Sequence, residues 1–327
     1  MIRELTSLRF IFIIFLFLHH AVMFRGGDMS VCFFFVLGGF CMTLGYKERL
    51  SMPGFRVGGF ILKRLFKFYP LHWICLLASL PLVHFCIENW SVFAVNALLL
   101  QSFIPKSSVY FSYNAVSWYL ADTVFFTFIF PLAGRFIFGL GRRGVWCVGV
   151  FVVVSYALLA CLLPVAYRHA IMYVNPFVRC ADFIMGILLA LGYERLRRNE
   201  RIASFVKGYP LLIQLMIIFS VVLLVIESYM LSDDMLLVPG LFWPLVAVCI
   251  VSAALASVNG GWLQNRILVR LGECSFAFYM VHHLVIRYFE NIPVFHSDRL
   301  LLTAVTFAVS LALSLVYSRV SWLTRRS

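Results

Sequence analysis

The segment LRFIFIIFLFLHHAVMF, residues 8–24, combines a long apolar run with one arginine and two neighbouring histidines. A helix that crosses the hydrocarbon core of a bilayer needs about 17–25 such residues. The segment has no small-residue cleavage site of the kind that ends a signal peptide, and it continues through Gly26 and Gly27 into a second apolar run. We therefore predict that it is retained as the first transmembrane helix.

The rest of the sequence extends this pattern. Of its 327 residues, 63% are hydrophobic and 13% are charged, whereas roughly half apolar content is typical of a soluble domain. Apolar runs of membrane-spanning length recur along the chain, and in lipid such runs form helices because each backbone polar group then has a partner. We predict an all-α polytopic membrane helix bundle in which residues 1–327 form a single transmembrane domain.

Ten runs of mostly apolar residues are long enough to cross a bilayer. A further stretch at residues 91–104 is shorter and carries Asn96 and Gln101, so we expect an interfacial or re-entrant piece there. An eleventh span at this place would invert the topology of everything after it. The ten predicted transmembrane helices cover residues 8–24, 30–46, 69–88, 116–138, 145–166, 176–193, 208–231, 236–257, 270–288 and 300–320.

The formal net charge of +13 would suggest a nucleic-acid partner in a soluble protein. Here the basic residues lie in short loops between the predicted helices. With ten helices and the N-terminus inside, 21 of the 27 lysines and arginines fall on the cytoplasmic side. Membrane proteins carry this excess in their cytoplasmic loops, so the sequence predicts that both termini are cytoplasmic and that no nucleic acid is bound.

Arg9 and His20 are the first candidate functional residues, because ionisable groups within a membrane span are costly. Eleven residues separate them, and eleven steps of about 100° return to almost the same face of a helix, roughly 16 Å further along its axis. His19 points about 100° away, so we expect it to make a structural hydrogen bond. A lone histidine on an apolar face is more often structural than catalytic, but the aligned Arg9 favours a functional His20.

The segment LGECSFAFYMVHHLVI, which starts at Leu271, repeats the theme of a histidine pair in an apolar run. His282 lies as far into its predicted helix as His20 does, and both helices run outward, so the two histidines are expected at a similar depth. Tyr279 is one turn before His282 and His283 and could orient either. No third metal ligand is evident, and the nine cysteines form no C-x-x-C pair, so we expect no metal.

The segment FILKRLFKFYPLHW, residues 60–73, places Arg64 and Lys67 on one helix face, with Lys63 beside them, just before the Tyr69-Pro70 step. One interpretation is ordinary positive-inside anchoring with an interfacial aromatic belt. The other is a phosphate-binding platform at a cytoplasmic opening, which suits a nucleotide-bearing donor.

Two acidic residues complete the set of intramembrane ionisable groups. Asp122 follows Trp118 by one turn in SWYLADTVFF. Asp182 follows Arg179 by three residues, which predicts an intramembrane ion pair with a structural role.

Three glycines in FFFVLGGFCMTLGY allow another helix or a thin cofactor arm to approach the second predicted helix closely. They are Gly38, Gly39 and Gly45.

Five segments, in this order and over essentially the whole chain, resemble the acyltransferase-3 family of bacterial integral-membrane O-acyltransferases. SLRFIFIIFLFLHH resembles its first helix, with Arg9 and His20 at the family's arginine and histidine. FFFVLGGF is similar to F-F-x-L-S-G-F, with Gly38 where serine is usual, and RCADFIMGILLA is similar to R-x-x-E-F-x-x-G-I-L-x, with Asp182 in place of glutamate. KRLFKFYPLHW resembles R-R-x-x-R-x-Y-P-x-x-W, with Lys67 in place of the second arginine. LGECSFAFYMVHHLVI resembles L-G-x-x-S-x-x-x-Y-x-x-H, which includes Tyr279 and His282.

The departure that matters for function lies in the fourth predicted helix. The family often has a W-S-L-S-x-E-E-like element in its fourth span, whereas SWYLADTVFF has Thr123 and Val124 where the carboxylates usually fall. Only Asp122 lies nearby, one position earlier. Either Asp122 substitutes for them or this chain handles its acceptor differently.

The resemblance implies an enzyme of the bacterial cytoplasmic (inner) membrane that takes an acyl group, usually acetyl, from cytoplasmic acyl-CoA. The acceptor would be a hydroxyl of an extracytoplasmic glycan or lipid-linked saccharide. His20 would act as general base or as a transient acyl carrier, with Arg9 and Asp122 as further catalytic residues. The donor site would consist of Lys63, Arg64, Lys67 and Tyr69, and the supporting residues would be Trp118, Tyr279, His282, Arg179 and Asp182.

Two other classes of function compete with this interpretation. A proton-coupled small-molecule transporter could use His20, Asp122 and the Arg179–Asp182 pair as a proton relay, but no matching pair of broken helices is evident in the two halves. A structural or scaffolding membrane protein would leave the intramembrane histidines unexplained.

Overall fold

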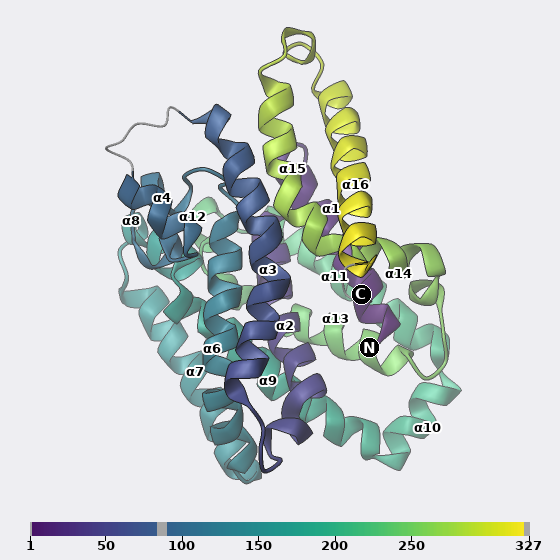
Figure 1. The fold of residues 1–327 in the computed structure, drawn as a ribbon. Coiled ribbons are helices and arrows are strands. Elements are labelled where there is room, and N and C mark those ends of the chain that lie inside the picture. The colour runs from purple at the N-terminus through teal and green to yellow at the C-terminus, as the bar shows by residue number, and fades with distance from the viewer. Residues whose placement is uncertain (1, 84–89, 324–327) are drawn as a thin grey trace.

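The computed structural model describes residues 2–83 and 90–323 of the chain. Within these ranges every regular element is a helix, which confirms the predicted all-α class (Figure 1). Eight helical segments are long and apolar enough to cross a membrane: Gly27–Leu50 (α2), Val57–Leu82 (α3 and the turn after it), Ser117–Gly139 (α6), Arg142–Leu162 (α7), Pro176–Arg198 (α9), Pro210–Met230 (α11), Pro239–Ala256 (a short turn and α13) and Arg299–Ser321 (within α16, Arg299–Leu323).

Two predicted spans do not meet this standard on their own. Helix α1 (Arg3–His20) carries Arg3, Glu4 and Arg9 within 18 residues, and α15 (Ser275–Glu290) is only 16 residues long. Both are nevertheless packed inside the bundle, because α1 contacts α2, α13, α14 and α15. The number of ten spans and the cytoplasmic position of both termini therefore stay predictions.

The predicted start of the third helix was wrong. It was placed at residues 69–88, whereas α3 is Val57–Ser79, followed by a turn at Leu80–Leu82; residues 84–88 lie outside the described residues. Pro70, next to the predicted start, lies inside α3, where it removes one backbone hydrogen bond without ending the helix. Lys63, Arg64 and Lys67 therefore project from a continuous helix and not from the loop before it.

The ninth predicted helix, 270–288, is broken into two. Helix α14 (Arg266–Glu273) ends at Cys274, and α15 begins at Ser275. Gly272 lies against α1, where an added Cβ would come within 1.8 Å of the carbonyl oxygen of Thr6. This contact brings the start of α15 close to the N-terminal helix.

Residues 91–104 were predicted not to span the membrane, and in the structure they form no long helix. The short helices of the described chain are α4 (Trp90–Ala97), α5 (Ser107–Tyr110), α8 (Val165–Arg168), α10 (Glu200–Gly208) and α12 (Asp233–Leu236), together with single turns at Gln101–Phe103, His169–Val174, Trp262–Gln264 and Pro293–Phe295. Most lie in connections between the long helices, and α10 forms the lower right edge of the bundle in the view of Figure 1.

Helices α2 and α9 pack backbone against backbone at two glycines. A Cβ on Gly39 would lie 2.0 Å from the carbonyl oxygen of Phe183, and a Cβ on Gly186 would lie 2.0 Å from that of Val36. Small residues allow such close approach between membrane helices, whose association depends on van der Waals packing. The predicted close approach is therefore confirmed at Gly39, and the α2–α9 pair forms the rigid centre of the fold.

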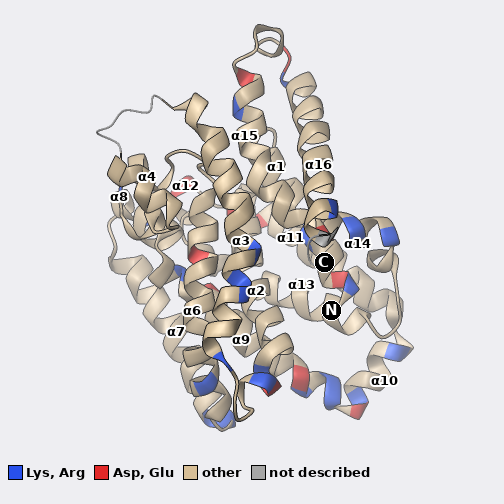
Figure 2. Ribbon diagram, viewed as in Figure 1, with Lys and Arg blue, Asp and Glu red and all other residues tan. Residues whose placement is uncertain are grey.

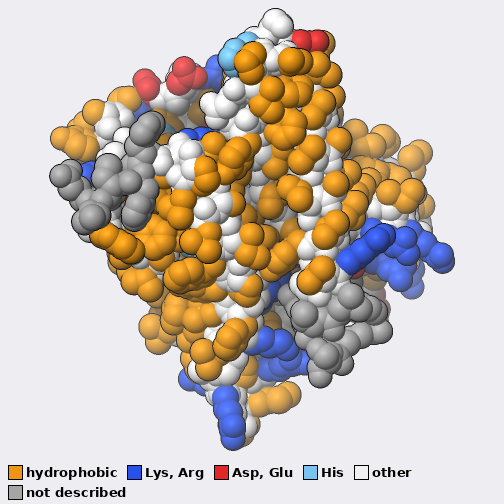
Figure 3. Space-filling model, turned by 45° about the horizontal axis from the view of Figure 1, so that its top comes forward, with side chains coloured by type: hydrophobic (Ala, Val, Ile, Leu, Met, Phe, Trp, Pro, Cys, Tyr) orange, Lys and Arg blue, Asp and Glu red, His pale blue; other side chains and the backbone are white. Residues whose placement is uncertain are grey.

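The surface has the character expected of a protein in lipid. Apolar side chains cover the face seen in Figure 3, and Phe151 and Leu162 of α7 are 72% and 79% exposed. Lysines and arginines gather mainly in the lower half of Figure 2, over α10 and the adjoining helix ends. The bundle thus has an apolar circumference and one basic end.

Candidate active site

His20, the last residue of α1, and His282 of α15 are hydrogen-bonded to each other. His20 Nδ1 lies 2.8 Å from His282 Nε2, and the two ring centroids are 5.0 Å apart. The sequence predicted the two histidines at a similar depth, and the structure brings them into direct contact. His282 is completely buried, whereas His20 is half-buried. His20 is therefore the member of the pair that a reactant can approach.

The surroundings of His282 fix the tautomers of both rings. His282 Nδ1 faces the carbonyl oxygens of Tyr279, at 2.7 Å, and Phe278, at 3.2 Å. A carbonyl oxygen only accepts, so Nδ1 carries the proton, and a neutral His282 offers a lone pair at Nε2. His20 Nδ1 donates to that lone pair, which leaves His20 Nε2 without a proton. A neutral imidazole held in this way can act as a base or as a nucleophile.

Two more histidines surround the pair. The His283 ring centroid lies 5.3 Å from that of His20, and the His19 centroid lies 5.5 Å away on the other side. His19 packs flat against Gly27, where an added Cβ would come within 2.5 Å of the imidazole ring. His19 was expected to make a structural hydrogen bond; what the structure shows for its ring is this packing contact. Among the described residues, no group of three or more His, Cys, Asp or Glu is arranged to hold a metal ion.

Tyr279 orients His282 through its backbone and not through its hydroxyl. The Tyr279 hydroxyl donates to the carbonyl oxygen of Val116 at 2.6 Å, which ties α15 to the start of α6. The sequence suggested that Tyr279 could orient a neighbouring histidine. In the structure its backbone carbonyl oxygen, one turn before His282, accepts a hydrogen bond from His282 Nδ1.

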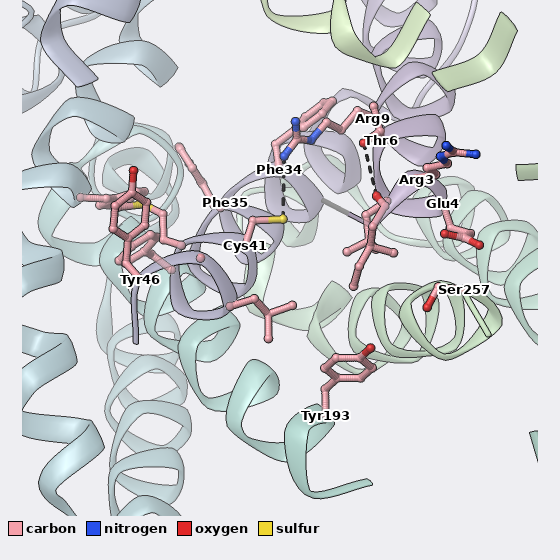
Figure 4. A pocket seen from close by; sticks show the side chains of 18 of the residues that line it. Arg3, Glu4, Thr6, Arg9, Phe34, Phe35, Cys41, Tyr46, Tyr193 and Ser257 are labelled. Atoms are coloured by element: carbon pink, nitrogen blue, oxygen red, sulfur yellow. Dashed lines mark hydrogen bonds between the residues drawn. The ribbon is translucent and has the colours of Figure 1, made fainter. Parts of the chain in front are cut away.

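A cavity of about 1710 Å³ occupies the basic half of the bundle (Figure 4). It exceeds the ~300–1,000 Å³ of most small-molecule sites, so it can take a ligand larger than a typical drug. Helices α1, α2, α3, α6 and α9 supply most of its walls. Gly38 and Gly45 of α2 are among the lining residues, and no atom lies within 4 Å of a Cβ built on Gly45. An unbranched chain can pass along this face of α2.

The cavity brings Arg9 together with the predicted cation cluster. Arg9, Lys63, Arg64 and Lys67 all line it. The Arg64 guanidinium is held over the rings of Tyr46, at 5.5 Å, and Phe60, at 5.6 Å. Such stacking fixes the orientation of the guanidinium and leaves its positive charge in place.

Two predicted site residues, Arg9 and Tyr69, differ in their relation to the cavity. Arg9 donates to Cys41 Sγ at 3.8 Å, which holds its side chain across α2 (Figure 4). Tyr69 is not among the lining residues; its hydroxyl donates to the carbonyl oxygen of Leu98 at 3.0 Å. Tyr69 thus ties α3 to the segment after α4.

The cavity ends one aromatic layer short of the histidine pair. Phe35 and Tyr119, the lining residues linked by ring contacts to the histidine pair, stack with centroids 4.5 Å apart. The Tyr119 ring then contacts Tyr279 at 5.0 Å, and Tyr279 contacts His282 at 5.8 Å. His20 is not a lining residue. The rings of Tyr119 and Tyr279 therefore separate the cavity from the site where the proton-free nitrogen lies.

Comparison with known proteins identifies the family of the chain. A model of the acyltransferase-3 family, described as an acyltransferase domain, matches residues 2–319.

The chain belongs to the acyltransferase-3 family.

The acyltransferase MdmB of Streptomyces mycarofaciens is 30% identical over 291 residues, which cover 80% of this chain and 69% of that protein. No solved structure shows a significant match. Membership of this family favours acyl transfer over the transporter and scaffold interpretations.

In the described chain of this acyltransferase-3 protein, Asp122 makes no hydrogen bond or ion pair with either histidine of the pair but interacts electrostatically with Tyr119 and Tyr279, the rings next to them. It is completely buried in α6, neither carboxylate oxygen has a well-formed hydrogen bond to a described residue, and its polar neighbour is Ser102. No hydrogen bond or ion pair among the described residues joins it to His20. Trp118, one turn earlier, packs against Tyr173 with centroids 5.2 Å apart. The catalytic role expected of Asp122 therefore stays a prediction.

The predicted intramembrane ion pair is present. Arg179 Nη1 lies 3.1 Å from Asp182 Oδ2, and neither side chain is exposed. Asp182 Oδ1 also accepts from Trp243 Nε1 at 2.5 Å, and the Arg179 guanidinium lies 4.8 Å from the ring centroid of Phe35. The pair links α9 to α13 and supports the wall of the cavity through Phe35.

Several lining residues were not anticipated. Tyr119 is next to Trp118 in sequence, but only the packing of α6 against α15 shows that its ring closes the cavity. Arg197 and Arg198 belong to a basic loop that topology alone explained, yet both line the cavity of this acyltransferase-3 protein. In both cases the sequence contained the residue type but not the neighbour that gives it a role.

Proposed function

We propose that this membrane acyltransferase moves an acyl group, usually acetyl, from acyl-CoA to a hydroxyl of an extracytoplasmic glycan or lipid-linked saccharide. The observation that carries the proposal is the His20–His282 hydrogen bond, because it leaves His20 Nε2 as a proton-free nitrogen on a half-buried ring. The cavity with its cationic walls supports a donor that carries phosphates.

The donor enters the cavity from the basic end of the bundle, which the proposal takes as cytoplasmic. Lys63, Arg64 and Lys67 bind its phosphates, and the pantetheine arm runs along the glycine face of α2 towards Phe35 and Tyr119. Arg9, which lies between the cation cluster and the inner end, orients the thioester. The rings of Tyr119 and Tyr279 move apart to admit the thioester to the histidine pair.

The reaction follows from the tautomers. The acceptor hydroxyl oxygen attacks the thioester carbonyl carbon while its proton passes to His20 Nε2. The His282 lone pair at Nε2 holds His20 in position and stabilises the imidazolium through the hydrogen bond. The tetrahedral intermediate then expels the CoA thiolate, which takes the proton from His20 and restores the neutral ring. Transient transfer of the acyl group to His20 Nε2 uses the same nitrogen.

The test uses purified protein in liposomes with radiolabelled acetyl-CoA and glycan from the native envelope. Loss of the thioester and transfer of label to glycan are measured for the natural protein and for His20→Ala. The variant is expected to lose at least 10²-fold in rate, of the order that a general base supplies. His296→Ala is the control, because His296 is an exposed histidine whose ring contacts the Glu290 carbonyl oxygen far from the pair. Near-normal transfer by His20→Ala would refute the assignment, and solute uptake without thioester loss would point to a carrier.

A further inference from the structure

A second group of cations lines the cavity on a wall different from that of the α3 cluster. Helix α9 ends with Arg195, Arg197 and Arg198 in its last turn, and two of these, Arg197 and Arg198, line the cavity. Arg195 instead lines a separate small pocket with Lys47. Cations in the last turn of a helix also favour its dipole, but that effect applies to all three arginines and does not select two of them.

The direction of this last turn is fixed by the chain after it. Asn199 follows Arg198 and caps the next helix, α10, by accepting hydrogen bonds from the backbone N–H groups of Arg201 at 3.0 Å and Ile202 at 3.3 Å. One residue thus ends α9 and starts α10. The turn that carries Arg197 and Arg198 is held in place on both sides.

The positive charge of this wall is available for a ligand. Three acidic residues line the cavity: Glu194 pairs with Lys47, Glu4 accepts a hydrogen bond from Gln264, and Glu48, like the other two, has no ion pair with Arg197 or Arg198 in the described chain. Neither Arg197 nor Arg198 forms an ion pair with any described residue, and both are exposed to the cavity side of the basic end. Arg197 also interacts with the hydroxyl of Tyr193, another lining residue that faces the cavity in Figure 4.

Acyl-CoA carries its negative charge in two places, the diphosphate that precedes the pantetheine arm and the monophosphate on the ribose 3′ oxygen. The α3 cations line the same cavity as Gly38 and Gly45 of α2, along which the pantetheine arm is proposed to run, so we assign the adjoining diphosphate to them. The α9 cations form a separate wall, which suits the phosphate that lies beyond the diphosphate. Arginine guanidinium groups bind phosphate oxygens by charge-assisted hydrogen bonds and often in pairs.

We infer that Arg197 and Arg198 form a subsite for the ribose 3′-phosphate of the donor. This inference rests on the proposed function, because it assumes that the cavity holds acyl-CoA. It assigns to α9 the ability to distinguish CoA from carriers that share its pantetheine arm but lack the 3′-phosphate.

The experiment measures the binding of CoA and of 3′-dephospho-CoA by titration calorimetry to the full-length protein in detergent. The natural protein is expected to bind CoA at least tenfold more tightly than 3′-dephospho-CoA, which corresponds to about 1.4 kcal/mol. Arg197→Gln/Arg198→Gln should lose this tenfold for CoA and stay within twofold for 3′-dephospho-CoA. Arg195→Gln, the matched control on the same turn, should change neither. Arg64→Gln should weaken both ligands.

Each other outcome has a definite meaning. Equal binding of the two ligands by the natural protein, an unchanged CoA affinity in the double variant, or equal losses for both ligands would overturn the 3′-phosphate subsite while leaving the donor cavity intact. A loss in Arg195→Gln as large as in the double variant would also overturn it. The effect would then come from the overall positive charge of this turn and not from direct contact with the phosphate. If the natural protein binds neither ligand, the proposed donor fails as well. The single variants Arg197→Gln and Arg198→Gln replace the double variant if it is not monodisperse.

Discussion

His20 and His282 are 262 positions apart in the sequence, yet their imidazole nitrogens lie 2.8 Å from each other. The bond joins the last residue of the N-terminal helix to a helix near the other end of the chain. Its direction is set by a backbone carbonyl, that of Tyr279, which no side-chain substitution removes. The position of the proton on His20 is therefore determined by the helix geometry of α15.

His282→Ala should lower kcat about 10²-fold and leave the KM for the donor unchanged. The substitution removes the acceptor that holds His20 Nδ1–H, so both tautomers and more ring orientations become populated, while His282 does not line the donor cavity. His282→Gln should recover part of the loss, since its side-chain oxygen can accept the same hydrogen bond. Steady-state kinetics per folded molecule would measure this. An unchanged kcat in His282→Ala would contradict a positioning role.

Tyr119→Ala should raise the ratio of acyl-CoA hydrolysis to glycan transfer. Removing the ring joins the cavity to the histidine pair and admits water to the thioester. Tyr119→Phe keeps the ring and should retain a near-normal ratio. Free thiol release and label transfer, measured in the same reaction, give the two rates. If Tyr119→Ala loses both activities in proportion, the ring does not separate water from the reaction.

Gly186→Ala should destabilise the bundle by about 1–3 kcal/mol or prevent folding, because its methyl group would meet the Val36 carbonyl oxygen at 2.0 Å. Gly192→Ala, on the same helix, has no atom within 4 Å of the new methyl group and should be neutral or up to about 1 kcal/mol stabilising. The thermal unfolding midpoint in detergent reports both effects. Equal midpoints for the two variants would show that α2 and α9 can move apart at little cost.

Arg179→Met should destabilise the protein by about 3–5 kcal/mol, since it leaves the Asp182 carboxylate buried without its cation. Adding Asp182→Asn should recover most of this loss, because the amide oxygen can still accept from Trp243 Nε1. Unfolding midpoints of the single and double variants test the pair. A double variant as unstable as the single one would indicate that Arg179 contributes through its ring contacts and not through the charge.

The sequence was sufficient for features that depend on one helix at a time. The length of the apolar runs predicted the helical class. His20 and His282 lie equally far from the starts of their predicted helices, and this predicted that they lie at a similar depth in the membrane. The spacing of Arg179 and Asp182 predicted their pairing, because residues three apart on a helix are neighbours.

Features that depend on packing between helices were not predictable. The predicted third helix began at residue 69, next to Pro70, whereas α3 begins at Val57 and continues through this proline, which membrane helices tolerate. The aromatic layer requires Tyr119 of α6 to meet Tyr279 of α15, and no periodicity in either segment specifies that contact. Likewise, Arg195, Arg197 and Arg198 look alike in sequence, and only the direction of α9 separates the two that face the cavity.

The tyrosine layer has a consequence for the energised membrane. A protein with a large aqueous cavity open on one side must still prevent protons and salts from leaking across the bilayer. Tyr119 lines the cavity, its ring contacts Tyr279, and neither His20 nor His282 is a lining residue. On the proposed route an acyl group passes between two aromatic rings, and these rings limit the leak of ions while it does.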